Sequence, residues 1–313
     1  MARIPLADVF GLRPLSVRLR EMKLALRGDG ITPKTKVGLS SRALIKPRLA
    51  FPLWLGKKPE GRLIPMYNLF NHTPPDLREG WSVEKTNVRD FRGGDLTYDS
   101  HNGTDFAVPP GTIITAAAPG VIVRCSNEFH RGGLKVFIDH GRGLITTYNH
   151  LAKVDVRVGE TVHRGQPIAR SGASGIDGFL LFPWSTPHLH LNVWLNGRYV
   201  DPFPHAGLAS LWQAGDRPLP VEKPSEFAHE SWEPTVWDGT RVAAEVAACI
   251  DPAVQRELAA CPDLATQAIP VMFQRNYFPF RFTKEVDLSP TEFAREARLS
   301  LPFRAEDYDG IVF

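Results

Sequence analysis

Two short motifs far apart in the chain carry side chains that could bind a metal ion. The first is His101-Asn-Gly-Thr-Asp105 and the second is His188-Leu-His190. Imidazole nitrogen and carboxylate oxygen are ligands that zinc binds at about 2.0–2.2 Å. Two histidines and one carboxylate leave a fourth tetrahedral position for water, as in catalytic zinc sites. Because the motifs hold four such groups, one histidine is left over for proton transfer.

The spacing of these residues is compatible with one site only if the chain turns between His101 and Asp105. In a strand, residues i and i+2 point to the same face, so His188 and His190 are neighbours about 7 Å apart at the backbone. His101 and Asp105 would lie about 13 Å apart in an extended chain, too far to share an ion. Asn102-Gly103 is a favourable place for the turn, because both residue types tolerate left-handed backbone angles.

The segment that contains both motifs has the pattern of a compact antiparallel β domain, which we place at residues 99–204. Before it we expect a basic N-terminal extension (1–64) and a lead-in segment (65–98), and after it a C-terminal accessory region (205–313). Short β-branched runs alternate with glycine turns, which predicts strands of four to six residues. These runs begin at Thr112, Gly120, Leu134, Leu144, Val158 and Arg164.

The C-terminal accessory region is predicted to be partly helical and contains no recognisable chemical motif. Residues 239–261 are rich in alanine and favour helices interrupted at Asp251-Pro252, and residues 271–278 could form a strand. Ser289-Pro-Thr-Glu292 has the pattern of a capping box with proline at the first helical position, which predicts a short helix to about Leu299. We expect this region to pack on the β domain or to mediate oligomerisation.

Positive charge is concentrated at the N-terminal end. The chain has a net charge of +3, yet residues 1–64 contain 14 Lys and Arg against 4 Asp and Glu. Such a basic arm could bind an anionic membrane surface or an anionic polymer, with nucleic acid a disfavoured partner. From Leu12 to Leu26 apolar residues alternate with basic ones, which predicts an amphipathic surface helix; a solvated basic extension is the alternative. The basic residues are Arg18, Arg20, Lys23 and Arg27.

Other compositional features restrict the class of protein. Cys125, Cys249 and Cys261 are too few and too unevenly spaced for a disulfide framework or a cysteine-rich zinc site. No run of 18 apolar residues predicts a transmembrane helix, and the N-terminus lacks the apolar segment of a Sec signal peptide. The sequence alone therefore predicts a cytoplasmic location.

A third histidine lies between the two motifs, and with it a family resemblance becomes clear. His150, in Thr147-Tyr-Asn-His-Leu151, could act as a general base or stabilise developing charge. It shares a strand face with Tyr148 if the strand extends that far. The chain resembles the lysostaphin-type (LytM-like) zinc metallopeptidases, a family of cell-wall endopeptidases, over roughly residues 98–204. The motifs that carry the resemblance are His101-x-Gly-x-Asp105, Pro109-x-Gly-Thr, Ala118-x-Gly120-x-Val, His140-Gly-x-Gly143, Tyr148-x-His150-Leu151, Val158-Gly-x-x-Val-x-x-Gly-Gln166 and His188-Leu-His190.

The resemblance implies a fold, a metal site and an activity. It implies a mainly β chain whose peptidase core is a small antiparallel β-sandwich, the duplicated hybrid motif fold, with a cleft across one sheet. It implies that His101, Asp105 and His190 bind one Zn²⁺ ion and that His150 and His188 are the catalytic pair. The implied reaction is hydrolysis of peptide bonds by a zinc-activated water, in peptidoglycan cross-links or glycine-rich bridges. That substrate lies in the cell envelope, in contrast to the location that the sequence alone predicts.

Two features depart from the family pattern and leave alternatives open. Asn192 stands where an acidic residue is common, which puts the support of the ligating imidazole in question. Residues 176–184 form an apolar insertion before the second motif that could cover the cleft or pack on the terminal regions. The alternative to an enzyme is a non-catalytic relative that binds cell wall or activates a hydrolase, although such members usually lose metal ligands. A lipoyl- or biotinyl-carrier domain is disfavoured, because no lysine stands in an exposed hairpin turn of that kind.

Overall fold

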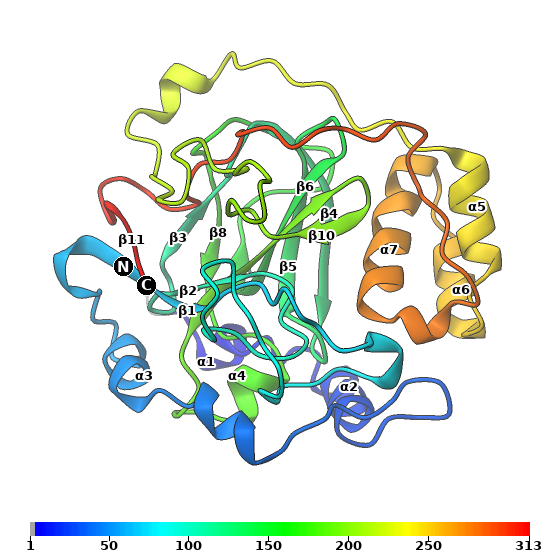
Figure 1. The fold of residues 1–313 in the computed structure, drawn as a ribbon, viewed down its shortest axis with the longest axis horizontal. Helices are drawn as coiled ribbons and strands as arrows, with labels where there is room; N and C mark the ends of the chain where they lie inside the picture. The colour runs from blue at the N-terminus through cyan, green and yellow to red at the C-terminus, as the bar shows by residue number, and fades with distance from the viewer. Residues whose placement is uncertain (1–3) are drawn as a thin grey trace.

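The computed structural model describes residues 4–313, and a large, mostly antiparallel sheet lies at its centre (Figure 1). Its longest path runs β11-β1-β2-β9-β6-β5-β4-β7, while β10 pairs with β9 and β8 pairs with β3 and β6. The mainly β fold class with antiparallel strands is therefore confirmed. The strands are β1 (Leu63–Asn68), β2 (Thr104–Ala107), β3 (Ile113–Thr115), β4 (Gly120–Glu128), β5 (Gly133–Asp139), β6 (Leu144–Val154), β7 (Thr161–Val162), β8 (Pro167–Ser171), β9 (His188–Leu195), β10 (Arg198–Val200) and β11 (Gly310–Val312).

Side chains alternate along β9, so one face of the sheet packs in the first hydrophobic core and the opposite face carries the histidines. Leu189, Leu191 and Val193 are fully buried in a core that also contains residues of β3 and β8. Because successive residues of a strand point to opposite faces, the residues from His188 to Trp194 with even numbers share the other face. Trp194 belongs to a second hydrophobic core at that face. The remaining positions of this face are available for the candidate site.

Three C-terminal helices cover the end of the sheet that carries Trp194, on the right of Figure 1. They are α5 (Gly239–Ala247), α6 (Pro252–Ala259) and α7 (Leu264–Tyr277), as the alanine-rich pattern predicted for the first two. The side chains of Asp238, Asp251 and Asp263 each accept hydrogen bonds from backbone N–H groups of the first turn. These caps satisfy donors that a helix end otherwise leaves without a partner, and so fix where each helix begins.

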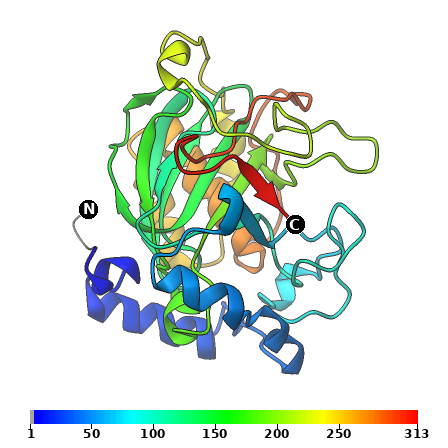
Figure 2. The same ribbon diagram turned by 90° about the vertical axis from the view of Figure 1, so that its left-hand side faces the viewer.

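Four short helices form a separate layer at the lower end of the molecule in both views (Figures 1 and 2). They are α1 (Leu6–Val9), α2 (Leu15–Arg27), α3 (Pro47–Trp54) and, from the insertion, α4 (Ile176–Leu180). Phe182 packs edge-on against Phe10 and Trp54, at centroid distances of 5.4 and 4.9 Å. The insertion therefore packs on the N-terminal region, which is one of the two alternatives that the sequence left open.

Short 3₁₀ helices lie at Leu39–Leu44, Glu60–Arg62, Leu77–Glu79, Pro224–Phe227 and Pro279–Arg281. Within residues 4–313, no helix has the length and apolar character needed to cross a membrane.

Two secondary-structure predictions in the C-terminal region were wrong. The apolar run 271–278, predicted as a strand, lies almost wholly in α7. This helix packs between the sheet and α5. A buried helix can be apolar on all sides, so the sequence of this run does not show the 3.6-residue apolar periodicity of a surface helix. The expected helix after Ser289 does not form, because Asn196 bonds to both the backbone N–H and the carbonyl oxygen of Phe293, groups that a helix would use for its own hydrogen bonds. The N-terminal region also differs, with three α-helices in residues 4–64 where one was expected.

Removing the indole at the centre of the second core is expected to destabilise the fold strongly. Trp194 is fully buried and its Nε1 donates to Oγ1 of Thr147 at 2.8 Å. Trp194→Ala should reduce the free energy of unfolding by about 3–5 kcal/mol, because it leaves a cavity under the helices. Denaturant unfolding measures this loss. Trp184→Ala, at a position half exposed to solvent, is the matched control and should cost clearly less.

Candidate metal centre

His101, Asp105 and His190 converge where β2 pairs with β9. The antiparallel register sets Asp105 directly opposite His190. Nε2 of His101 lies 3.1 Å from Oδ1 of Asp105 and 3.2 Å from Nδ1 of His190. Nδ1 of His190 lies 2.7 Å from the same carboxylate oxygen. All three side chains are buried, and their three ligand atoms form one small triangle.

The size of this triangle fits a tetrahedral metal ion. Ligand atoms at about 2.0–2.2 Å from such an ion lie about 3.3–3.6 Å from one another. The three separations of 2.7, 3.1 and 3.2 Å are a few tenths of an ångström shorter. A small outward movement of three side chains would therefore admit the ion. Two imidazoles and one carboxylate are a donor set suited to zinc.

Residues at the end of β1 hold two of these side chains in place. Nδ1 of His101 lies 2.6 Å from the carbonyl oxygen of Leu69, so this nitrogen donates its proton and Nε2 keeps a free lone pair. Asn68 donates from Nδ2 to Oδ2 of Asp105 at 2.7 Å, which leaves Oδ1 free to face the imidazoles. Such outer hydrogen bonds orient metal ligands and fix their tautomers. No local pattern pointed to Asn68, which lies 37 residues before Asp105.

The structure also brings His150 and His188, predicted as the catalytic pair, beside the triangle. Their ring centroids are 4.7 Å apart, and Nε2 of His188 lies 3.7 Å from Oδ1 of Asp105. Nδ1 of His150 lies 2.7 Å from the carbonyl oxygen of Ser174, and Nδ1 of His188 lies 2.7 Å from that of Thr186. Each imidazole therefore donates Nδ1–H to the backbone and keeps a basic Nε2.

Burial and charge set the protonation of these groups. Burial lowers the pKa of His150 by more than the carboxylate of Asp177 raises it. Burial likewise lowers the pKa of His190 to about 4, against the opposing effect of Asp105. For Asp105 itself burial acts to raise the pKa, but the charges of His101 and the other histidines outweigh it and hold the pKa well below its usual range. At neutral pH the site thus offers an unprotonated His190 imidazole and the Asp105 carboxylate, the forms that bind metal.

The backbone of His150 explains how it reaches the site, and it corrects one expectation. His150 has a φ of 58°, in the left-handed region that few residues other than glycine adopt. The irregularity interrupts side-chain alternation along β6, so Tyr148 points into the first core while His150 contacts His188. The expectation that Tyr148 and His150 share a strand face was therefore wrong. Such backbone strain is concentrated at functional sites in proteins.

Asn192, which departs from the family pattern, supports the turn between the first two ligands. Its Nδ2 donates to the side-chain and backbone oxygens of Asn102, both at 2.9 Å. Its Oδ1 accepts from Nδ2 of Asn149 at 2.9 Å and from the hydroxyl of Tyr277 at 2.8 Å. An acidic residue at position 192 could not donate to Asn102. Tyr277 belongs to α7, so the accessory region, where no motif was recognised, contributes to the site.

We expect loss of the Tyr277 hydroxyl to weaken metal binding. Tyr277→Phe removes one donor to Asn192 and loosens the turn that joins His101 to Asp105, so metal affinity should fall about tenfold, the lower end of such effects. Competition with a chromophoric chelator measures the affinity. Tyr199→Phe is the matched control, because Tyr199 packs on the same Trp194. Equal affinities of Tyr277→Phe and wild type would show that this network does not support the ligands.

A glycine in the turn allows His190 to approach. A Cβ atom at Gly103 would lie 2.6 Å from Nε2 of His190 and 2.6 Å from the carbonyl oxygen of Leu191. Gly103→Ala should therefore displace His190 and lower metal affinity by about 10–100-fold, in the same competition assay. Gly30→Ala, at a position with open space around it, is the control and should bind as wild type does. Unchanged affinity in Gly103→Ala would remove His190 from the ligand set.

The insertion adds a carboxylate that the sequence did not indicate. Asp177, in the first turn of α4, places Oδ2 3.7 Å from Nε2 of His150, and its side chain is half exposed. The imidazoles of His150 and His188 and this carboxylate each offer a ligand atom within a common 4.8 Å. The insertion therefore packs on the N-terminal helices and also reaches the rim of the catalytic pair.

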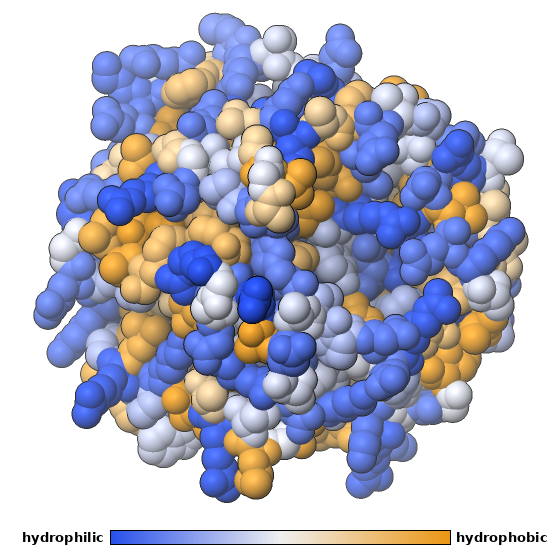
Figure 3. Space-filling model, in the orientation of Figure 1, coloured by the Kyte–Doolittle hydropathy of each residue, from blue (hydrophilic) through white to orange (hydrophobic). Residues whose placement is uncertain are grey.

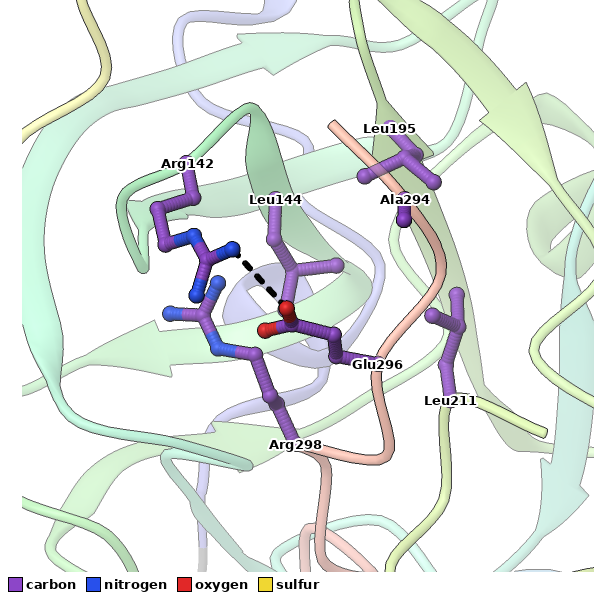
Figure 4. Close-up of a pocket in the computed structure, with 7 residues that line it drawn as sticks. All are labelled: Arg142, Leu144, Leu195, Leu211, Ala294, Glu296 and Arg298. Carbon is purple, nitrogen blue, oxygen red and sulfur yellow. Dashed lines mark ion pairs between the residues drawn. The ribbon is translucent and has the colours of Figure 1, made fainter. Parts of the chain in front are cut away.

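The small cavity drawn in Figure 4 is separate from this site. Its volume is about 10 Å³, room for roughly one water. The C-terminal segment crosses the sheet there, and Arg142 forms an ion pair with Glu296 at 2.8 Å. The lining residues are Arg142, Leu144, Leu195, Leu211, Ala294, Glu296 and Arg298, none of which belongs to the candidate metal centre.

Comparison with known proteins places the matched region in one family. The model of "Peptidase family M23" matches residues 99–202. Peptidoglycan DD-endopeptidase ShyA of Vibrio cholerae is 41% identical over 102 residues, 32% of this chain and 22% of the relative. Lysostaphin of Staphylococcus simulans is 32% identical over 126 residues, 39% of this chain and 24% of the relative. The match spans only about a fifth to a third of the length of the curated relatives.

A solved structure can also be aligned with part of this chain. The catalytic domain of the antimicrobial peptidase lysostaphin from Staphylococcus simulans is 32% identical to this chain. The alignment covers 33% of this chain and 77% of that domain, and the TM-score is 0.28.

Proposed function

Because residues 99–202 form a domain of peptidase family M23, we propose that this chain is a zinc-dependent endopeptidase that hydrolyses peptide cross-links of peptidoglycan. The relatives it matches include peptidoglycan DD-endopeptidases. The observation that carries the proposal is the convergence of three potential ligands with two further imidazoles whose basic nitrogens remain free. A non-catalytic relative that only binds cell wall would not need this complete set.

The residues divide into metal ligands and proton-transfer groups. We assign Nε2 of His101, Oδ1 of Asp105 and Nδ1 of His190 to the ion. When bound, zinc lowers the pKa of a coordinated water to about 7 and polarises the scissile carbonyl. Asn68 and the Leu69 carbonyl keep the ligands oriented during the reaction.

His188 is the residue that we assign to accept the proton of the attacking water. Its Nε2 is free and is the nearer of the pair to the carboxylate of Asp105, at 3.7 Å. The same proton then passes from His188 to the leaving amine as the peptide bond breaks, either directly or through the His150 imidazole, whose ring centroid lies 4.7 Å from that of His188. The carboxylates of Asp105 and Asp177 flank the two imidazoles and stabilise the positive charge that this transfer creates.

Purified peptidoglycan sacculi provide the test. The zinc-loaded chain should convert cross-linked muropeptide dimers into monomers, which mass spectrometry of the products identifies. Sacculi with glycine bridges, assayed in parallel, distinguish the bond that is cleaved. Binding to both kinds of sacculi without release of any fragment would refute the enzyme and support the non-catalytic alternative.

A further inference from the structure

A second group of potential metal ligands lies outside the candidate metal centre. Nε2 of His72 is 2.7 Å from Oδ2 of Asp201, and the rings of His72 and His205 have centroids 4.3 Å apart. Each of the three residues offers a ligand atom within 4.8 Å of the others. His72 precedes the peptidase domain, whereas Asp201 and His205 follow β10, so the fold brings together two distant parts of the chain.

The loop that carries two of these residues holds them in a binding orientation. Asp201 is buried and its Oδ1 accepts from the backbone N–H of Phe203 at 2.9 Å, which leaves Oδ2 for another partner. Nδ1 of His205 lies 2.9 Å from the carbonyl oxygen of Phe203, so Nδ1 donates and Nε2 keeps its lone pair. Pro202 and Pro204 restrict the backbone on either side of Phe203.

The cluster is accessible from solvent, and a nearby arginine leaves the Asp201 carboxylate available. The side chain of His72 is 21% exposed, so an ion can reach the cluster from solvent. The nearby guanidinium of Arg295 donates to the carbonyl oxygens of Asp201 and Phe203, at 2.7 and 3.4 Å. Because Arg295 binds carbonyl oxygens, Oδ2 of Asp201 stays available.

We propose that His72, Asp201 and His205 form a second site for a divalent transition metal such as zinc, with water completing the coordination. The ion would tie the lead-in segment to the end of β10. This tie bears on the candidate metal centre, because Asn71, next to His72, donates its N–H to the carbonyl oxygen of His101 at 2.9 Å. The second site is thus a structural support and does not depend on the proposed peptidase activity.

Zinc content of the full chain tests this proposal without any activity assay. After equilibration with zinc and gel filtration, elemental analysis should give about two equivalents for wild type and about one for His205→Ala or His72→Asn. Asp105→Asn should also retain about one, and Asp105→Asn combined with His205→Ala none. His163→Ala controls for loss of a histidine elsewhere. One equivalent in wild type, or two in both His205→Ala and His72→Asn, would overturn the second site.

An independent observation concerns α2, which turns its apolar stripe towards solvent. Leu15, Leu19 and Leu26 lie on one face of the helix by its 3.6-residue period, and their side chains are 58%, 50% and 49% exposed. Arg18, about 80° around the helix from the middle of this stripe, is buried and pairs with Glu21. The helix forms as predicted, but Arg18, which was expected among its surface basic residues, is buried. A soluble surface helix normally buries its leucines, so three exposed leucines beside exposed basic residues are unusual.

Basic residues flank this stripe on α2, and further exposed apolar residues lie elsewhere in the same layer of helices. On α2 itself, Arg20, Lys23 and Arg27 are exposed beside the leucines. The insertion, in the same lower layer of helices, adds exposed apolar side chains, and hydrophilic and apolar residues alternate along the lower edge of Figure 3. These side chains, each 44–49% exposed, are Leu180, Leu181, Phe182 and Trp184.

We infer that α2 and residues 180–184 form a surface that docks on an anionic lipid bilayer. Leucine and aromatic side chains would enter the boundary between headgroups and acyl chains, while Lys and Arg would attract anionic headgroups. The excess of positive charge in residues 1–64 is complementary to that partner.

Vesicle sedimentation separates lipid binding from other roles of the basic region. Wild type should bind vesicles of phosphatidylcholine with phosphatidylglycerol, and bind phosphatidylcholine alone at least about tenfold more weakly. Serine at Leu15, Leu19 and Leu26 together should reduce binding to the anionic vesicles at least about tenfold. Serine at the exposed Leu208 and Leu219 is the matched control. Failure to bind anionic vesicles, or unchanged binding by the triple variant, would overturn the proposal of a lipid-binding surface. A basic region that binds only an anionic polymer would give the first of these results.

Discussion

Asp105→Asn is expected to abolish zinc binding at the candidate metal centre and peptide hydrolysis with it. The substitution keeps the shape of the side chain but removes the negative charge between His101 and His190. Outer hydrogen bonds alone typically contribute about 10–100-fold to metal affinity, so loss of a direct ligand should exceed about 100-fold. Zinc content, measured in a His205→Ala background that removes the second site, and release of muropeptides from sacculi record the two losses.

A carboxylate at the rim provides the control for this result. Asp177→Asn removes the same charge near the same histidines, but from a half-exposed side chain outside the ligand triangle. It should keep its full zinc content. If Asp105→Asn retained zinc as well as Asp177→Asn does, the metal would be bound elsewhere and the ligand assignment would be wrong.

His188→Ala is expected to separate metal binding from catalysis. The variant should retain zinc, because the His188 ring lies beside the triangle and its Nδ1 is bonded to the backbone at Thr186. It should lose about 10²–10⁴-fold in kcat, the usual contribution of a positioned general base, with little change in KM. Steady-state hydrolysis of a soluble cross-linked muropeptide, alongside zinc content, measures both effects.

This variant also distinguishes the two histidines of the second motif. Loss of zinc in His188→Ala, with zinc retained in His190→Ala, would show that His188 is the metal ligand and His190 the proton-transfer group. His163→Ala, which removes a histidine far along the chain from either motif, should leave both kcat and zinc content unchanged.

The grouping of the site residues could be predicted because it depends on local geometry. A strand period of two places His188 and His190 on one face, and the turn at Asn102-Gly103 lets the chain reverse before Asp105. The structure follows the strand pattern, and strand pairing then brings Asp105 opposite His190. The chain bends at Gly103, but neither Asn102 nor Gly103 adopts a left-handed backbone angle; glycine is needed there because a Cβ would clash with His190. The role of these residues as ligands stays a prediction until an ion is measured.

The supporting residues could not be predicted, because they approach the site through tertiary packing. Tyr277 reaches Asn192 from a helix 85 residues later, and Asn68 reaches Asp105 from the preceding strand. A lone tyrosine or asparagine in an unremarkable segment carries no local signal of such a contact. The proposed boundaries at residues 64, 98 and 204 likewise stay predictions.

The N-terminal region illustrates a related limit. Alternation of apolar and basic residues correctly predicted a helix near α2, because the pattern depends only on the helical period. Which side faces the protein depends on the partner surface, and there Arg18 donates to the backbone oxygen of Asn127 at 2.7 Å. The burial of an arginine and the exposure of leucines therefore became visible only in the folded chain.

The dependence of hydrolysis on bound zinc tests the central claim most directly. Metal-free His205→Ala protein, which lacks the proposed second site, would be titrated with zinc while muropeptide hydrolysis is followed. We predict that the rate rises in proportion to the metal bound and reaches its maximum at about one equivalent. Hydrolysis at the full rate by the metal-free protein, or none at full occupancy, would contradict a zinc peptidase built on His101, Asp105 and His190.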